Sequence, residues 1–418
     1  MILPALSLAS ARQGGVPLAA ERAIFYLQPI PMSAEMDAKI AAFIEWMRAQ
    51  NVNTDRIQLQ HNAEIGGNGI YAKKEIRPNE MILELPLDVL ITSTTVMNHK
   101  ECAEMLRGSD VKFTPSEAIA LFFIVEDKNP NSSYAPYLTM LPRTFGTPLF
   151  QGLDVVGLPF HDQVVWERQV KEIKDIYDKI PRVRPGTTKQ EILWAWHVVN
   201  TRCIFIENLN VHEDLDNKEG DNIAVIPLVD MLNHVPDPSC EARLRKTGDI
   251  YEVVSNKTIV PGSEIFVTYG YHGNAKLWLE YGFEIPGNIM NKIPISIELF
   301  IALADKSGMK VSREITNILK DANHLCTIYA SEDELSTTFK TCVRILFLQR
   351  HQFANWRKIV YEELDDELKE KISNFCPKII HSLRGGLMGK MNQAPEPIKH
   401  FWQEQIDIVD VILEADKH

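Results

Sequence analysis

Apolar residues recur with a helical period near the start of the chain. They stand at i, i+3, i+4 and i+7, as Ile40, Phe43, Ile44 and Met47. This spacing predicts a helix with one apolar face, for which Ser33 is a suitable N-cap. Residues 55–95 then alternate apolar and polar side chains around turns at 66–69 and 77–79, a pattern that indicates β-strands.

A second block of helical period follows these strands. Thr114-Pro115-Ser116-Glu117 has the form of a capping box with proline at the first helical position, ahead of the apolar run 118–125. Apolar residues then recur at helical spacing over 165–180, and Pro181 is expected to end that helix. Residues 96–198 therefore form a predicted helical insert.

Short β-like runs return at 224–226, 250–254 and 264–269, separated by proline and glycine. From about Ile295 onward the pattern is helical again, and Ser331-Glu332-Asp333-Glu334 has the form of a capping box ahead of a helix over 338–353. The pattern thus predicts two blocks of strands, separated by a helical insert and followed by a helical tail.

The composition is that of a globular protein. Of the 418 residues, 45% are apolar and 24% are charged, which allows a large core and two or three domains. The net charge of −12 argues against direct binding of nucleic acid, since such binding depends on Lys and Arg. A basic peptide partner fits this charge better.

The six cysteines lie far apart, without Cys-x-x-Cys or Cys-x-Cys spacing, so we expect reduced thiols and no zinc site. The sequence has no run of ~18 apolar residues, which a membrane span would need. Residues 1–32 begin with a stretch up to Arg22 that has two arginines and one acid, Glu21. An unstructured extension ahead of a start at Met32 or Met36 is favoured there over a targeting signal.

Two segments near the strands are candidates for ligand binding. Gly66-Gly67-Asn68-Gly69 would let a ligand approach the backbone closely, or it is a plain turn. Asp230-Met231-Leu232-Asn233-His234 places a carboxylate, an amide and an imidazole after an apolar run. Such groups either pair internally, with Asn233 capping its own backbone, or meet a polar ligand.

Two further segments carry aromatic or basic residues. Tyr269 ends a predicted strand, and Tyr281-Gly282-Phe283 follows twelve residues on; these rings are either core aromatics or part of a site. Asn200-Thr201-Arg202 stands where the insert returns to the strands. Arg202 is suited to hold a carboxylate, although a surface salt bridge is the commoner use of an arginine.

In this order the segments resemble the split SET-domain methyltransferase family of the Rubisco large-subunit methyltransferase type, most closely its SET domain-containing protein 4 branch. The resemblance covers residues 35–300. It is carried by Gly67-Asn68-Gly69-Ile70-Tyr71-Ala72, Pro136-Tyr137-Leu138, Trp194-Ala195-Trp196, Asn200-Thr201-Arg202, Asp230-Met231-Leu232-Asn233-His234, Tyr269-Gly270 and Leu279-Glu280-Tyr281-Gly282-Phe283.

The resemblance implies an α+β fold. A SET β-fold of small sheets with a pseudoknot would be interrupted by the helical insert and followed by an all-helical C-terminal domain. The expected units are an unstructured extension (1–32), an N-terminal helix with the first part of the SET core (33–95), the insert (96–198), the second part of the core with the cofactor and catalytic motifs (199–290), and a helical domain like the family's substrate-binding domain (291–418).

The activity implied by the resemblance is transfer of a methyl group from S-adenosylmethionine (AdoMet) to the side-chain amine of a lysine in a protein, histone or non-histone. Tyr269 would be the catalytic tyrosine at the methyl-transfer channel. The implied cofactor-binding residues are Gly66, Gly67, Asn68, Arg202, Asp230, Asn233, His234, Tyr281 and Phe283, and no metal is implied. A free lysine has a pKa near ~10.4, so a narrow apolar channel would help by favouring the neutral amine.

Two alternatives stay open. One related branch methylates histidine and, as the resemblance implies, has tryptophan where this chain has Val229. A non-catalytic SET-fold protein-binding module would predict damage at Asn233, Tyr269 or the glycine turn, and none is damaged. Val235-Pro236 follows His234 where the histone-directed branch continues to Pro-Asn, so histone is one candidate substrate among others. We expect a monomer in the cytosol or the nucleus that binds neither nucleic acid nor membrane.

Overall fold

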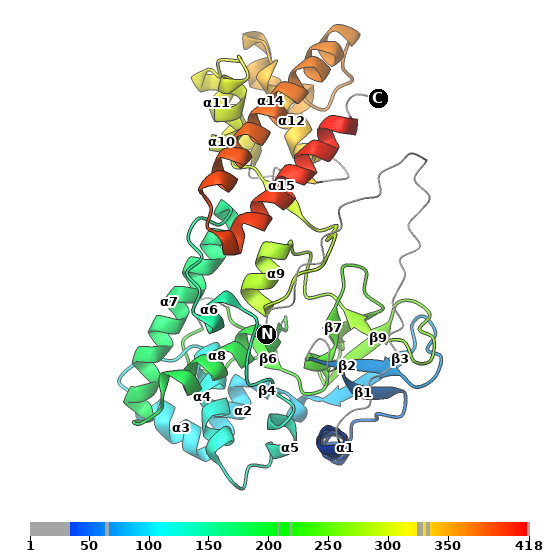
Figure 1. Ribbon diagram of the computed structural model, residues 1–418, viewed down its shortest axis with the longest axis vertical. Helices are drawn as coiled ribbons and strands as arrows, with labels where there is room; N and C mark the ends of the chain where they lie inside the picture. The colour runs from blue at the N-terminus through cyan, green and yellow to red at the C-terminus, as the bar shows by residue number, and fades with distance from the viewer. Residues whose placement is uncertain are drawn as a thin grey trace.

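The computed structural model describes residues 34–62, 67–207, 209–217, 220–323, 329–331 and 335–415 (Figure 1). The predicted extension 1–32, the predicted N-cap Ser33 and the predicted ligand-binding residue Gly66 lie outside the described residues.

The first strands form two small antiparallel arrangements beside the N-terminal helix. Helix α1 (Ala34–Ala49) buries Ile40, Phe43 and Met47, as its apolar spacing predicts. Strand β1 (Ile57–Asn62) pairs with β2 (Gly67–Ala72). Strand β3 (Met81–Pro86) pairs with β9 (Ile250–Ser255), which also pairs with β8 (Cys240–Leu244). A sheet therefore joins residues on both sides of the insert.

The insert is helical. Its elements follow η1 (Leu87–Val89) and β4 (Ile91–Thr92) and are α2 (Ser93–Asn98), α3 (Lys100–Arg107), α4 (Pro115–Lys128), α5 (Ala135–Leu138), α6 (Pro148–Gln151), α7 (Phe160–Val183) and α8 (Lys189–Arg202). The capping box at Thr114 is confirmed, because its hydroxyl and the Glu117 side chain each bond to the other's backbone N–H.

The predicted end of a helix at Pro181 is wrong, because α7 continues to Val183. A proline costs most in the middle of a helix, where it removes a hydrogen bond and its ring meets the preceding turn. Pro181 stands within the last turn, and the N–H of Arg184 still donates to the Ile180 carbonyl at 2.8 Å. The helix therefore ends just beyond the proline.

The chain returns from the insert directly into a second group of strands. Strand β5 (Cys203–Phe205) follows α8 and pairs with β6 (Ile223–Val225), which also pairs with β4. After η2 (Val229–Met231), strand β7 (Asn233–His234) runs parallel to β10 (Phe266–Val267). The expected α+β arrangement of small sheets is confirmed.

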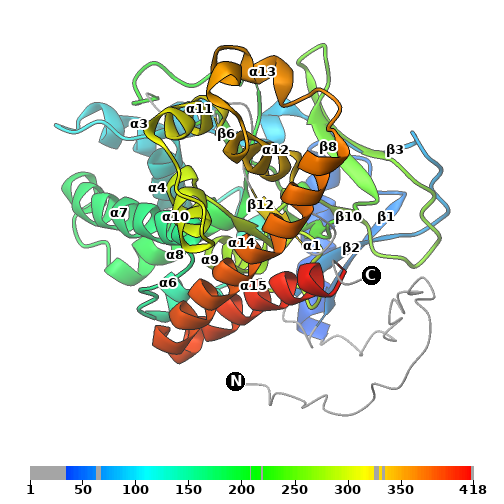
Figure 2. The ribbon, with the colours of Figure 1, turned by 90° about the horizontal axis from the view of Figure 1, so that it is seen from above.

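The C-terminal region starts at residue 292, after α9 (Asn274–Tyr281) and a connecting segment, and is mainly helical. Its helices are α10 (Ile297–Lys306), α11 (Arg313–Asn323), α12 (Thr337–Leu346), η3 (Arg350–Asn355), α13 (Trp356–Ile359), α14 (Asp366–Gln393) and α15 (Glu396–Ala415). In Figures 1 and 2, α14 and α15 lie side by side, and the first turns of α15 pack against α7 and α9. The region has a hydrophobic core of its own.

Two details of the C-terminal prediction are wrong. The region is not all-helical, because β11 (Lys292–Pro294) pairs antiparallel with β12 (Tyr329–Ser331). Ser331 lies in that strand, and residues 332–334 lie outside the described residues. Helix α12 is instead capped by Ser336, whose hydroxyl accepts from the N–H of Phe339 at 3.0 Å.

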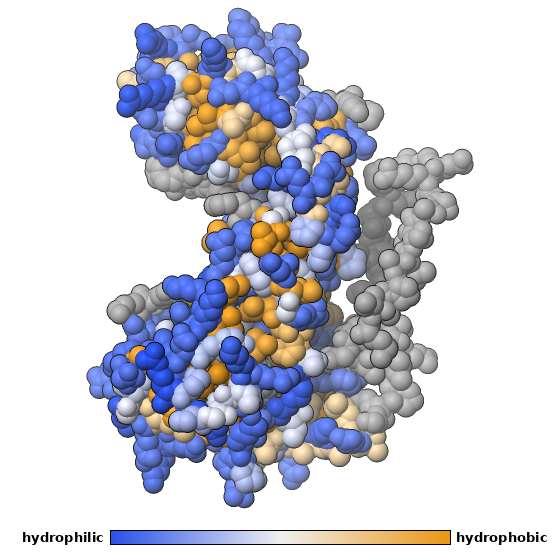
Figure 3. Space-filling model, turned by 60° about the vertical axis from the view of Figure 1, so that its left-hand side comes forward, coloured by the Kyte–Doolittle hydropathy of each residue, from blue (hydrophilic) through white to orange (hydrophobic). Residues whose placement is uncertain are grey.

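The surface narrows between the C-terminal helices and the rest of the molecule. Figure 3 shows this indentation on one face, where apolar residues reach the surface among hydrophilic ones. None of the helices in the described part of the chain combines the length and the apolar character that a membrane span requires.

His197 of α8 supports a pH prediction. The ring is fully buried: its Nδ1–H donates to the Leu193 carbonyl at 2.7 Å, and its Nε2 accepts from the Thr147 hydroxyl at 2.8 Å. Burial lowers the pKa of His197 to about 4. The unfolded chain then binds a proton at higher pH than the folded chain, so stability is complete above pH ~6.5 and falls as the pH drops towards 4.

We expect His197→Gln to remove part of this dependence. Between pH 7 and pH 4.5, the free energy of unfolding of the wild type should fall by roughly 2 kcal/mol more than that of the variant, because only the wild type must keep this ring neutral. Urea unfolding at both pH values measures the difference, and His351→Gln, at an exposed histidine, serves as the control. Equal losses in wild type and His197→Gln would contradict the prediction.

Candidate active site

Asn233 joins three segments that are distant in sequence. Its Nδ2 donates to the backbone carbonyl of Asn68 at 3.0 Å and to Oε1 of Glu264 at 2.6 Å. Both amide hydrogens are thereby used, so the amide is oriented and its Oδ1 remains available as an acceptor. The predicted turn at Gly67-Asn68-Gly69 is wrong, because these residues lie in β2 and pair with β1. Strand β2, the Asn-His segment and the residues that lead into β10 meet at the Asn233 side chain.

Glu264 is in turn held on its other oxygen by Tyr71, whose hydroxyl donates to Oε2 at 3.3 Å. Burial raises the pKa of the Glu264 carboxyl, which its hydrogen bonds with Asn233 and Tyr71 partly oppose. A Cβ on Gly69 would lie 2.5 Å from Oε1 of Glu264. The absence of a side chain at Gly69 therefore leaves room for this carboxylate.

Arg202 and Asp230 form a buried ion pair. Nη1 of Arg202 donates to Oδ2 and to the backbone carbonyl of Asp230, each at 3.0 Å. The hydroxyl of Tyr137, from α5 of the insert, donates to the same Oδ2 at 2.7 Å. Burial raises the pKa of Asp230, and the Asp230 carboxylate raises the pKa of Arg202 against the effect of burial. Arg202 therefore stays charged.

Four aromatic rings gather beside this pair. The Tyr269 ring stacks on His234 with centroids 5.2 Å apart, and it lies 4.9 Å from Tyr281 and 6.4 Å from Phe283. The Tyr269 hydroxyl donates to the carbonyl of Leu232 at 2.7 Å. Burial raises the pKa of Tyr269 well above its usual value and that of Tyr281 to about 12, so both phenols are neutral.

Three polar atoms in this region are buried without a hydrogen-bond partner, namely Arg202 Nε, Asp230 Oδ1 and His234 Nε2. Nδ1 of His234 accepts from the N–H of Tyr269 at 3.0 Å, so Nε2 carries the hydrogen and is a donor. Buried groups of this kind are costly unless something completes their bonding. Two donors and one acceptor are thus available to a polar ligand.

A cavity of about 940 Å³ opens next to the ion pair. Of the sequence-predicted site residues, Arg202, Asp230, Tyr269 and Tyr281 line it, whereas Asn68, Asn233, His234 and Phe283 do not. The predicted residues therefore divide into a group that lines the cavity and a group that does not. The Tyr269 ring, which stacks on His234 and lines the cavity, connects the two groups.

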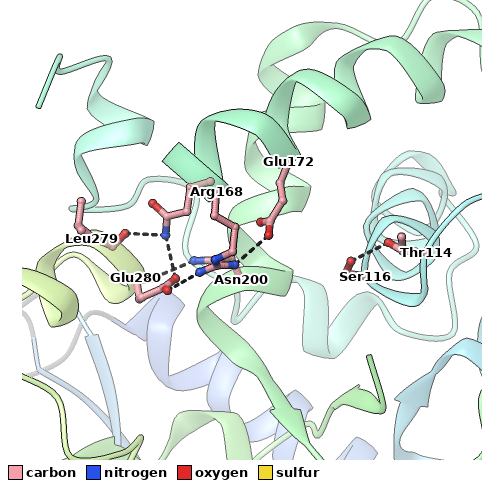
Figure 4. Close-up of polar contacts among 8 residues, drawn as sticks. Thr114, Ser116, Arg168, Glu172, Asn200, Leu279 and Glu280 are labelled. Carbon is pink, nitrogen blue, oxygen red and sulfur yellow. Dashed lines mark hydrogen bonds and ion pairs between the residues drawn. The ribbon is translucent and has the colours of Figure 1, made fainter. Parts of the chain in front are cut away.

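Helix α9, which carries Tyr281, is fastened to the insert by polar contacts at its C-terminal end. Nη2 of Arg168 donates to Oε1 of Glu280 at 2.5 Å, and Nε2 of Gln169 donates to its Oε2 at 2.8 Å. Nδ2 of Asn200 donates to the Glu280 carbonyl at 3.0 Å. Figure 4 shows Arg168 and Asn200 next to Glu280 at this end of α9.

Gly282 follows α9 and has a φ of +82°, a left-handed conformation that glycine adopts without strain. A Cβ there would lie 2.6 Å from the carbonyl carbon of Gly146. The two backbones therefore touch, and the insert fixes the chain between Tyr281 and Phe283. The same loop carries Thr147, the partner of His197.

Sequence reasoning missed several contributors to the site. Glu264 belongs to no motif. Tyr137, Glu280 and Asn200 stand in segments that carry the family resemblance, but the sequence assigns none of them a role. No local pattern marks these residues, because each acts on partners at least 31 positions away, and for Glu280 as many as 112. The described residues contain no group of three or more His, Cys, Asp or Glu placed to hold a metal ion.

Part of the chain matches a known protein family. Residues 67–270 match the family model of the SET domain. SET domain-containing protein 4 of Homo sapiens is 27% identical over 323 residues, covering 73% of this chain and 72% of that protein. Ribosomal lysine N-methyltransferase set11 of Schizosaccharomyces pombe is 26% identical over 56% of this chain and 58% of its own length. Actin-histidine N-methyltransferase of Gallus gallus is 22% identical over 64% and 46%.

Solved structures share the fold. The SET domain of LSMT bound to lysine and AdoHcy superposes with a TM-score of 0.57 at 15% identity, covering 91% of each chain. Rubisco LSMT bound to AdoMet gives the same TM-score at 16% identity and the same coverage. With the small sheets, the helical insert and the helical C-terminal region in place, the chain contains a region that matches the SET domain and has homology to SET domain-containing protein 4.

Proposed function

We propose that this protein transfers a methyl group from AdoMet to the side-chain amine of a lysine in a protein substrate. The observation that carries the proposal is the neutral, buried Tyr269, whose ring lines the cavity and stacks on His234, the neighbour of Asn233. The SET-domain match and the relatives named as lysine N-methyltransferases support it. So do structures of the same fold that hold AdoMet or lysine with AdoHcy.

The polar groups of the site fit the requirements of AdoMet. Its amino-acid end needs donors for a carboxylate and acceptors for an ammonium, and the buried atoms without partners, Arg202 Nε and Asp230 Oδ1, are one of each. Asn233 Oδ1, the His234 imidazole and the backbone of Gly67 and Asn68 would hold the rest. Tyr281 and Phe283 would form the aromatic wall.

AdoMet supplies the methyl group already activated on a sulfonium, so the protein's task is to place the acceptor. A lysine amine in the cavity must be neutral to attack, and desolvation there favours the neutral form. The Tyr269 hydroxyl donates its hydrogen to the Leu232 carbonyl, which leaves its oxygen lone pairs to act as acceptors towards the reacting groups. Holding nucleophile and methyl in line contributes several kcal/mol, on the order of 7–11 in favourable intramolecular cases.

Lysine is preferred over histidine as the acceptor. Val229, at the position where the histidine-directed branch has tryptophan, is buried and lines the cavity. Its small side chain leaves no ring at this point of the wall to stack on an imidazole. A non-catalytic binding module is disfavoured because Asn233 and Tyr269 are both present and bonded.

Asn233→Ala should weaken AdoMet binding at least tenfold, because it removes the Oδ1 acceptor and the link between Asn68 and Glu264. Tyr269→Phe should bind AdoMet within threefold of the wild type but lose at least 100-fold in the rate of tritiated methyl transfer to protein. Calorimetric titration and the transfer assay measure the two effects. Full transfer activity in Tyr269→Phe would rule out the role given to its hydroxyl.

The size of the side chain at position 229 should determine how well a lysine enters the cavity. We expect methyl groups only on lysine side chains when labelled products are digested and analysed by mass spectrometry, and Val229→Trp should reduce lysine methylation by tenfold or more because the ring narrows the cavity. Methyl groups on histidine in the wild-type products would exclude lysine specificity and favour the alternative.

A further inference from the structure

Helix α9 is held at both ends by different parts of the molecule. Its C-terminal end is bound by Arg168, Gln169 and Asn200 of the insert, as described above (Figure 4). Its N-terminal end is bound by α15, the last helix of the C-terminal region. This second attachment has no role in the function proposed so far.

The N-terminal attachment centres on Asn274, whose side chain is only 2% exposed. Its Oδ1 accepts from the N–H of Ile285 at 3.0 Å and from Nδ2 of Asn288 at 3.1 Å. Its Nδ2 donates to the carbonyl of Ile285 at 3.0 Å and to Oε1 of Glu404 at 2.6 Å. All four hydrogen-bonding positions of the amide are filled, and three of the four partners lie in the segment that follows α9.

Glu404 supplies the fourth partner, and it is the one that comes from the C-terminal region. Helix α15 also covers α9 through apolar and aromatic contacts. The Phe401 ring is tilted against that of Trp278 with centroids 5.3 Å apart, and it packs in one cluster with Ala275 and Leu279. His400 contacts Glu284 at 3.1 Å, just beyond Phe283. The last helix therefore touches both α9 and the segment behind the aromatic wall.

We propose that Glu404 is a positioning residue of the methyl-transfer site, through which the C-terminal region sets the placement of Tyr281 and Phe283. The proposal rests on the proposed function for its consequence in catalysis. Asn274 ties the start of α9 to Ile285, so residues 274–285 form a closed loop, and both aromatic residues lie within it. Glu404 fixes the orientation of the Asn274 amide that closes this loop.

Removal of the Glu404 carboxylate leaves one buried amide hydrogen of Asn274 without an acceptor. The amide is then free to turn towards another acceptor, and any turn breaks its paired bonds to Ile285. Tyr281 and Phe283 lie 4.9 Å and 6.4 Å from the Tyr269 ring, so a shift of this loop changes the wall that faces AdoMet. The C-terminal region thus shapes the site without lining it.

The test compares Glu404→Ala with Glu404→Gln in the full-length chain. We expect the alanine variant to bind AdoMet at least tenfold more weakly in calorimetric titration. The glutamine variant keeps an acceptor oxygen for Asn274 and should bind within threefold of the wild type. Asp407→Ala removes an exposed carboxylate one turn further along the same helix, where it accepts from Gln403, and should bind as the wild type does.

Hydrogen exchange gives a readout that does not depend on the cofactor. Exchange over residues 274–291 should rise in Glu404→Ala and stay at the wild-type level in Glu404→Gln and Asp407→Ala. Leu383→Ala, which removes a side chain from the C-terminal core away from α9, serves as a control for lost stability and should leave both AdoMet binding and this exchange unchanged.

The outcomes separate the two proposals. Wild-type protein that does not bind AdoMet would overturn the proposed function, while raised exchange in Glu404→Ala would still support the positioning role. AdoMet binding in Glu404→Ala within twofold of the wild type, or unchanged exchange over 274–291, would overturn the positioning role. An equal loss of AdoMet binding in Leu383→Ala would also overturn the positioning role, because general destabilisation would then explain the weaker binding.

Discussion

The structure depends on one side chain, the amide of Asn233. The strands around the site are short, and β7 and β10 contain only two residues each, so their ladders contribute few hydrogen bonds. The amide of Asn233 joins Asn68 of β2, 165 positions earlier, to Glu264, 31 positions later. Because both its hydrogens are committed, its oxygen has a fixed direction. The placement of Tyr269 and of the groups that would hold AdoMet follows from this junction.

The helical insert is part of the site rather than an addition to it. Helix α8 ends at Arg202, and α5 supplies the Tyr137 hydroxyl, so Oδ2 of the buried Asp230 carboxylate is hydrogen-bonded by two residues of the insert. The Tyr137 ring lies against Trp46 of α1 with centroids 6.4 Å apart. A buried carboxylate without such partners would be costly. The ion pair can therefore exist only when the insert has packed on the core.

The aromatic wall shows the same dependence on distant parts of the chain. Tyr281 is held from the insert through Glu280 and the close approach of Gly282 to Gly146. It is held from the C-terminal region through Asn274 and Glu404. The C-terminal region has its own core, so its docking on α9 is a separate packing event. Three parts of the chain must meet before the wall is complete.

The sequence by itself determined the features that depend on neighbours along the chain: the apolar face of α1, the capping box at Thr114 and the order of strands, insert and helical tail. Its motifs also marked Asn233 and Tyr269, since rare groupings of polar residues near apolar runs are visible locally. Tertiary structure alone decided which of two similar serines, Ser331 or Ser336, caps α12, and that α7 passes Pro181. It also decided that Glu264, Tyr137 and Glu404 serve the site, because a hydrogen bond between distant residues leaves no periodic trace in the sequence of either partner.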